Sequence, residues 1–219
     1  MVEKMNQTRQ IIGKTRETKN VQSRGVARRL KLVEAAKDLL HSKSPQEISF
    51  KEISKKAGVP EGSAYHFYAN KYDIYAAVAS DLSELFIEVH SQKIEKSRVN
   101  SWSDIVDILI DRGANVYRRN SVACELLIGS KTPNEIKLID RQNDKRIAEI
   151  MSERFTEHFQ LPEINNFETI LFYFIEMTDV LFGISYRDNE TISDEIIEEA
   201  KRVGKGYLST YLPPVLNPA

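Results

Sequence analysis

Apolar residues recur at three- and four-residue steps along most of the chain from Arg24 onward. This spacing places them on one face of an amphipathic helix. No segment alternates apolar and polar residues over a useful length, so the sequence predicts an all-α protein of about nine helices without a sheet. The expected helices cover about 24–42, 49–57, a short segment within 62–68, 71–96, from 101 or 103 past 116, 121–128, 133–159, 162–186 and 193–210.

Local signals fix several helix ends. Ser49 is expected to be an N-cap, and Glu52 three residues later would complete a capping box. Asn70 is expected to cap the long helix in the same way, with Asp73 at its third position. Gly58 is expected to end the helix at 49–57, at a position where a positive φ is needed.

Residues 47–74 carry the most informative pattern. Ile48, Ile53 and Val59 give one apolar face, and a four-residue turn then leads to a segment of small, hydroxyl and aromatic side chains. In a helix-turn-helix, a short turn makes the second helix project outward from the first, so that its side chains can enter a DNA groove. The sequence therefore predicts a helix-turn-helix and a DNA-binding regulator.

Charge divides the chain in the same place. Residues 1–75 contain 15 Lys and Arg against 8 Asp and Glu, whereas residues 76–219 contain 16 against 24. A basic front and an acidic remainder indicate that only the front meets a polyanion. The alternative is a chance distribution of charge over solvated helices.

Other function classes find little support. Cys124 is the only cysteine, and the four histidines lack metal-ligand spacing, so we expect no disulfide, metal, cofactor or catalytic site. The longest apolar stretch, residues 170–184, is interrupted by Glu176 and Asp179 and falls short of a membrane span. The N-terminus lacks the apolar core of a secretory signal. We expect a soluble, cytoplasmic protein.

The motif can be read residue by residue. It consists of Ser49, Ile53-Ser54-Lys55-Lys56-Ala57-Gly58-Val59, Pro60, Gly62, Ser63, Ala64, Tyr65-His66-Phe67-Tyr68 and Lys71-Tyr72-Asp73-Ile74. Over residues 25–75 the chain resembles the tetracycline-repressor (TetR) family of bacterial regulators. It departs from the family pattern at Glu61, where a neutral or basic residue is common, at Ala64, where Leu is usual, and at Phe67, where His or Tyr is frequent.

The resemblance implies an organisation and a mechanism. The polar, basic composition of residues 1–23 predicts a flexible arm. The resemblance implies that residues 24–75 are the DNA-binding domain and residues 76–219 a helical domain for effector binding and dimerisation. A homodimer would present two heads to a palindromic operator in double-stranded DNA. A small molecule of unknown identity, bound among the C-terminal helices, would release the repressor from DNA.

Candidate contacts follow from chemistry and from the motif. Hydroxyl, imidazole and ammonium groups bind phosphates and base edges, and glycine lets a backbone approach them closely. The candidate DNA-binding residues are Ser49, Lys51, Pro60, Gly62, Ser63, Tyr65, His66, Lys71, Arg24 and Arg28. We expect Tyr68 to pack in the core instead.

Candidate effector contacts are the aromatic residues of the C-terminal helices, with one cysteine and one acid. An aromatic cavity with an acid suits an apolar or cationic ligand. The candidates are Trp102, Tyr117, Cys124, Phe155, Phe159, Phe172, Tyr173, Glu176 and Phe182. Two other functions use the same chain: an activator or architectural DNA-binding protein without a ligand, and a ligand-binding protein whose head no longer reads DNA.

Overall fold

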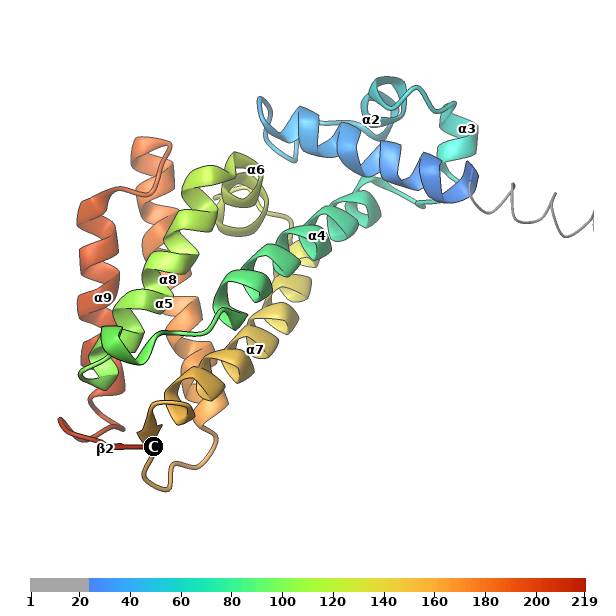
Figure 1. Ribbon diagram of the computed structural model, residues 1–219. Coiled ribbons are helices and arrows are strands. Elements are labelled where there is room, and N and C mark those ends of the chain that lie inside the picture. The colour runs from blue at the N-terminus through green and yellow to red at the C-terminus, as the bar shows by residue number, and fades with distance from the viewer. Residues whose placement is uncertain (1–23) are drawn as a thin grey trace, which may run out of the picture.

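The computed structural model describes residues 24–219, and these form a largely helical molecule (Figure 1). The proposed arm, residues 1–23, lies outside the described residues. Residues 24–40 are helical. The later elements are α2 (Phe50–Lys56), α3 (Glu61–Ala64), α4 (Lys71–Ser91), a 3-10 turn (Lys96–Arg98), α5 (Trp102–Arg119), α6 (Ser121–Ala123), a π-helical turn (Cys124–Ile128), α7 (Asn134–Thr156), β1 (Phe159–Gln160), α8 (Phe167–Asn189), α9 (Asp194–Leu208) and β2 (Asn217–Pro218).

The predicted caps explain where several helices begin. Asn70 accepts hydrogen bonds from the backbone N–H groups of Tyr72 and Asp73 at the start of α4. Ser49 accepts from the N–H of Glu52, but the Glu52 carboxylate bonds Lys43 at 2.5 Å instead of closing the predicted capping box. These caps satisfy amide groups that have no partner within the helix.

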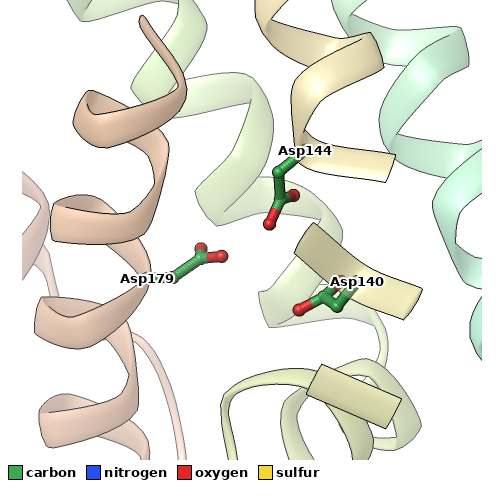
Figure 2. Close-up of side chains that lie close together, drawn as sticks. All are labelled: Asp140, Asp144 and Asp179. Atoms are coloured by element: carbon green, nitrogen blue, oxygen red, sulfur yellow. The ribbon is translucent and has the colours of Figure 1, made fainter. Parts of the chain in front are cut away.

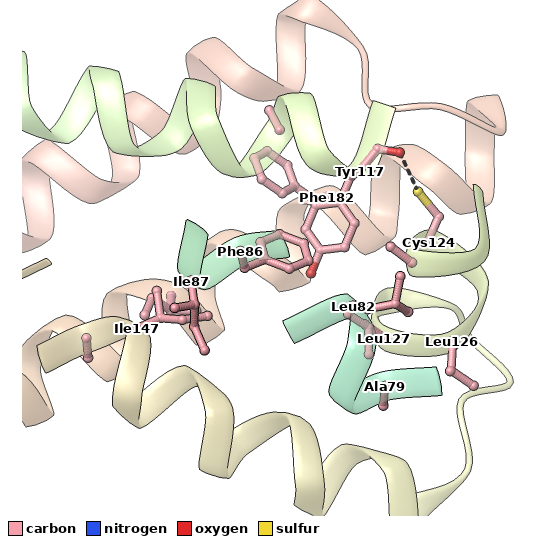
Figure 3. Packing of buried hydrophobic residues seen from close by; sticks show 14 of the residues in the cluster. Ala79, Leu82, Phe86, Ile87, Tyr117, Cys124, Leu126, Leu127, Ile147 and Phe182 are labelled. Carbon is pink, nitrogen blue, oxygen red and sulfur yellow. Dashed lines mark hydrogen bonds between the residues drawn. The ribbon is translucent and has the colours of Figure 1, made fainter. Parts of the chain in front are cut away.

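The C-terminal helices form a closed circuit around one core. Helix α4 packs on α5 and α7, α7 packs on α8, α8 on α9, and α9 returns to α5. Figure 1 shows the head of the first helix, α2 and α3 at one end of α4, with the rest of α4 lying along α7. Figure 3 shows the core between them, where the ring of Tyr117 from α5 lies against Phe86 from α4 and meets Phe182 from α8 edge to face.

The structure differs from the predicted elements in several places. A two-residue antiparallel pair joins β1 to β2, although no sheet was expected. Helix α8 begins at Phe167 rather than near Pro162, after Asn166 in a left-handed conformation (φ 59°). Helix α4 ends at Ser91, five residues before the predicted end. Val26 and Leu30 of the first helix are exposed, because only later turns of that helix meet the core.

The apolar stretch within α8 is too short and too often interrupted for a bilayer. No helix in residues 24–219 has the length and apolarity needed to cross a membrane. This agrees with the interruption of residues 170–184 by two acids.

Candidate DNA interface and effector cavity

Helices α2 and α3 form the predicted helix-turn-helix. Gly58 has a φ of +63°, so the turn uses the left-handed conformation that glycine adopts without strain. Val59 and Ala64 are buried beneath the turn and α3, which holds the outer face of α3 away from the core. Helix α3 begins at Glu61, one residue before the expected Gly62.

The outer face of this head carries most of the predicted DNA contacts. Tyr65 is 52% exposed and stacks on Phe50, with ring centroids 4.4 Å apart. Gly62 has no atom within 4 Å of the position that a Cβ would take. The other exposed candidates are Ser49, Lys51, Pro60, His66, Arg24 and Arg28, and Ser63 is half-buried. The geometry brings these groups to one end of the molecule, and their contact with DNA stays a prediction.

Lys71 has a different environment from the other candidates. Its Nζ donates to the carbonyl oxygens of Pro45 at 2.9 Å, Gln46 at 3.1 Å and Ile48 at 2.8 Å. An ammonium has three donors, so all of them are used inside the protein. Burial lowers the pKa of Lys71. The structure therefore gives Lys71 the role of fixing the loop before α2, and the predicted phosphate contact stays untested.

Tyr68 packs as expected at the base of the head, but only partly. It is half-buried, and the guanidinium of Arg29 lies 5.8 Å from its ring centroid. The neighbouring Tyr75 is fully buried and donates its hydroxyl to the carbonyl of Pro45 at 3.0 Å. The start of α4 is thus bound firmly to the loop that leads into α2.

Two adjoining cavities lie among the C-terminal helices. The inner one has a volume of about 40 Å³ and is bounded by residues of α4, α5, α7 and α8. The outer one, about 330 Å³, lies between the π-helical turn, α7 and α8. Leu127, Asp140, Asp144 and Asp179 line both, so the three aspartates stand where the cavities meet.

Figure 2 shows the three carboxylates pointing toward one another, two from α7 and one from α8. One oxygen from each lies within 4.8 Å of the others, close enough for one cation to contact all three. Asp144 is only 6% exposed. The Tyr117 hydroxyl donates to Asp179 at 3.2 Å, and no described residue donates a hydrogen bond to Asp140 or Asp144.

Burial and mutual repulsion make these carboxyls weak acids. Burial, then the nearby Glu176 carboxylate, raises the pKa of Asp140 to about 7. Burial, then Asp179, raises the pKa of Asp144 far above its ordinary range, and burial and Asp140 do the same for Asp179. His90 in the inner cavity has its pKa lowered to about 4 by burial, so it is neutral at pH 7. A cation bound among these carboxyls would favour their deprotonated forms.

Only part of the predicted effector set reaches these cavities. Tyr117 and Phe182 line the inner cavity, and Glu176 lines the outer one, where it bonds Arg141 at 3.1 Å. Phe172 and Tyr173 border a separate surface groove. Buried elsewhere in the core are Trp102, Cys124, Phe155 and Phe159.

Those four residues pack against protein rather than lining the cavities described above. The Trp102 indole donates to the carbonyl of Pro213 at 2.9 Å. The Cys124 thiol donates to the carbonyl of Tyr117 at 3.3 Å, as Figure 3 shows. Phe155 meets Phe167 edge to face. Aromatic residues in the sequence therefore identified residues of the core more often than residues of the cavities.

Sequence reasoning missed the aspartates, although two signals were present. Asp140 and Asp144 are four residues apart, which places them on one helix face. Asp179, together with Glu176, interrupts an apolar stretch of α8. Each signal alone is common on solvated helices, and only the packing of α7 against α8 joins them.

Comparisons with known proteins agree with this architecture. The family model described as bacterial regulatory proteins, tetR family, matches residues 32–78. The model described as tetracyclin repressor-like, C-terminal domain, matches residues 100–212. Together the two matches cover the head and most of the helical domain.

Solved structures share the fold at low sequence identity. A TetR-family transcriptional regulator from Streptomyces coelicolor is 21% identical, with a TM-score of 0.60 over 85% of this chain and 98% of that one. SmeT, the repressor of the multidrug efflux pump SmeDEF of Stenotrophomonas maltophilia, is 15% identical, with a TM-score of 0.59 over 84% of this chain and 90% of its own.

A third structure is the fatty acid degradation regulator FadR from Bacillus halodurans. It is 14% identical, with a TM-score of 0.55 over 83% of this chain and 94% of that one. The helix-turn-helix geometry, the helical domain and the two family matches lead to one conclusion. The chain belongs to the TetR family of transcriptional regulators.

Proposed function

We propose that this protein is a homodimeric repressor that binds a palindromic DNA operator and is released when a small molecule enters the cavity. TetR-family regulators are typically DNA-binding repressors and are generally not enzymes. We carry both properties over to this chain, together with the division into a head (residues 24–75) and a regulatory domain (residues 76–219).

One observation carries the proposal: α4 belongs to both regions. At its first residue, Lys71 holds the loop before α2 through three hydrogen bonds. Further along the same helix, Ser83, Phe86 and His90 line the inner cavity. A displacement of α4 by a ligand would therefore move the head, since the helix is continuous over Lys71–Ser91.

The dimer is supported by exposed apolar residues on α8 and just after α9. Tyr173, Val180 and Ile184 of α8 are exposed, and so is Tyr211 just after α9. Other apolar residues of these two helices are buried within the subunit, namely Phe167, Leu171, Phe174, Ile197, Ala200 and Leu208. The outward face of α8 and α9 is the part left for pairing in a four-helix arrangement.

The dimer surface can be tested by one charge. Val180→Asp should convert the protein to monomers in light scattering, because a carboxylate would be buried in the interface. Leu138→Asp on α7 is the matched control, since Leu138 is 63% exposed and Val180 is 64% exposed. Equal masses for both variants and the parent would contradict this placement of the interface.

DNA reading is tested by selecting bound duplexes from a random library at near-physiological salt. We expect a palindrome whose half-sites lie one helical turn, about 34 Å, apart. Gly62→Glu should abolish enrichment by repelling phosphates, whereas Gly62→Ala should retain more, because a side chain at Gly62 meets no protein atom within 4 Å. No enriched sequence with the folded dimer would contradict the proposal.

A further inference from the structure

The three aspartates at the junction of the cavities form an acceptor site with few protein donors. Asp144 is only 6% exposed, and it lines both cavities. Among residues 24–219, none donates a hydrogen bond to its carboxylate. A buried polar group without a partner is costly, and Asp144 points to where a ligand would supply the donor (Figure 2).

The charged groups around the site do not neutralise it. Tyr117 of α5 donates to Asp179, and His90 of α4 is neutral at pH 7. The outer cavity is lined by Lys137 and Arg141 of α7 and by Glu176 and Arg187 of α8. Arg141 bonds Glu176, and no described cation forms a salt bridge with the three aspartates.

The spacing of the carboxylates suits an ammonium group. Three charge-assisted hydrogen bonds of about 2.8 Å in tetrahedral directions place their acceptors about 4.6 Å apart. The three oxygens here lie within 4.8 Å of one another. Lys71 shows the same arrangement within this protein, where one ammonium donates to three oxygens at 2.8–3.1 Å.

The surroundings indicate that the cation is organic. Leu127 and Ile128 give the outer cavity apolar walls beside the carboxylates, and Phe86 and Phe182 close the small inner cavity behind them. A hard metal ion requires six or more oxygen ligands. An apolar wall instead favours burial of the hydrocarbon part of an organic ligand. The outer cavity of about 330 Å³ lies within the usual range for small-molecule sites.

We propose that this cavity binds a primary amine with an apolar body, its ammonium group held by Asp140, Asp144 and Asp179. This names the chemical class of the effector, and it rests on the proposed function for its consequence at DNA. Because the carboxyls bind protons tightly in the free protein, amine binding at pH 7.5 releases protons.

The probe pair is n-hexylamine and 1-hexanol, which differ only at the head group. Calorimetric titration of the full chain, without DNA, should show the amine binding at least about tenfold tighter than the alcohol. The enthalpy measured in phosphate should differ from that in HEPES, because the two buffers take up the released protons with different heats. Equal affinity for amine and alcohol would overturn the proposal.

Two substitutions test the residues. Asp144→Asn and Asp179→Asn keep the side-chain shape, and each should weaken the amine at least about tenfold and reduce the proton release. The control is Glu149→Gln, an exposed acid of the same helix, which should leave both unchanged. Unchanged amine affinity in both Asn variants overturns the site. Asp179→Asn provides the test if Asp144→Asn does not fold.

Two further titrations separate the other outcomes. Manganese(II) binding that needs the aspartates, without amine binding, would overturn the amine in favour of a metal site. Amine binding is measured without DNA, so its failure is distinct from failure of the proposed repressor. An amine that binds through the aspartates but leaves operator affinity unchanged supports the site and contradicts the release mechanism.

Discussion

Lys71 in the head and the three aspartates in the regulatory domain are opposite solutions to one electrostatic problem. At Lys71, one ammonium is surrounded by three carbonyl oxygens of the same chain. At the cavity, three carboxylates converge, and the only hydrogen bond that they receive from the described residues comes from Tyr117. The ammonium of Lys71 has all its hydrogen-bond partners within the protein. The carboxylates lack donors, so hydrogen bonds from a ligand would stabilise the complex.

This difference assigns different tasks to the two ends of α4. A satisfied donor at the start of the helix fixes the loop that leads into α2, so the head moves with the helix. The unsatisfied acceptor site on α7 and α8, in the cavity that α4 also lines, makes the helix bundle sensitive to what binds there. Removing a partner should therefore destabilise the head, whereas removing an acid should stabilise the cavity.

The largest effect is expected at Lys71. Lys71→Met keeps the length of the side chain but leaves three carbonyl oxygens without their donor, so the free energy of unfolding should fall by about 3 kcal/mol. Urea unfolding measures it, with Lys51→Met as the exposed control, which should change stability by less than about 0.5 kcal/mol.

The salt dependence of operator binding by Lys71→Met separates a structural role from DNA contact. If Lys71 binds phosphate, its loss should reduce the slope of log affinity against log salt by about one. If it acts only on the loop, the slope should stay as in the parent. A Lys71→Met protein as stable as the parent would contradict the internal role.

The opposite sign is expected at the cavity. Asp140 has a pKa of about 7 when folded, whereas an unfolded aspartate has about 3.9. Between these values the folded state binds more protons, so stability falls as pH rises from about 4 to about 7. Asp140→Asn should remove part of this slope and raise stability at pH 7.5 by about 2 kcal/mol.

Thermal unfolding at several pH values measures this change. Glu149→Gln is the matched control, since an exposed acid of α7 should leave the pH dependence as it is. A parent protein that gains stability as the pH rises from 5 to 7.5, by more than the Asp140→Asn variant does, would show that the carboxyl is stabilised when charged.

A smaller effect is expected at Tyr65 of the head. Tyr65→Phe keeps the ring on Phe50 but removes the exposed hydroxyl. Operator affinity should fall by about 1 kcal/mol while the melting temperature stays constant. Tyr65→Ala, which also removes the stacked ring, should lower both. A Phe variant that binds DNA as tightly as the parent would remove the hydroxyl from the DNA interface.

The two regions also differ in how far the sequence could predict them. In the head, Gly58, Ser49 and Asn70 act on neighbours within a few residues, so spacing alone located the turn and two helix starts. The bonds of Lys71 reach back 23 to 26 residues, and nothing in the local pattern distinguished them from a phosphate contact.

The cavity depends wholly on packing. Asp140 and Asp179 are 39 residues apart in sequence and meet only because α7 lies against α8. Burial is what distinguishes them from the solvated acids of the same helices. Val26 and Leu30 show that the apolar pattern can also mislead. They continue the pattern of the first helix but are exposed, because that end of the helix does not reach the core.

The smallest effect is expected at a hydrogen bond that joins α7 to α4 beside the cavity. Asn143 of α7 lines the inner cavity beside the aspartates, and its side-chain amide donates to the Ser83 hydroxyl of α4 at 2.6 Å. Ser83 in turn donates to the carbonyl of Ala79 within α4. A ligand that shifts α7 at Asp144 would act on α4 through this bond.

Asn143→Ala should change hexylamine affinity by less than about threefold but reduce the effect of the amine on operator affinity by about half a kcal/mol. Ser83→Ala removes the other partner and should give the same loss. The double variant should lose no more than either single one, because both remove one interaction. Additive losses would mean that Asn143 and Ser83 act separately, and that α4 responds through its apolar contacts with α7 alone.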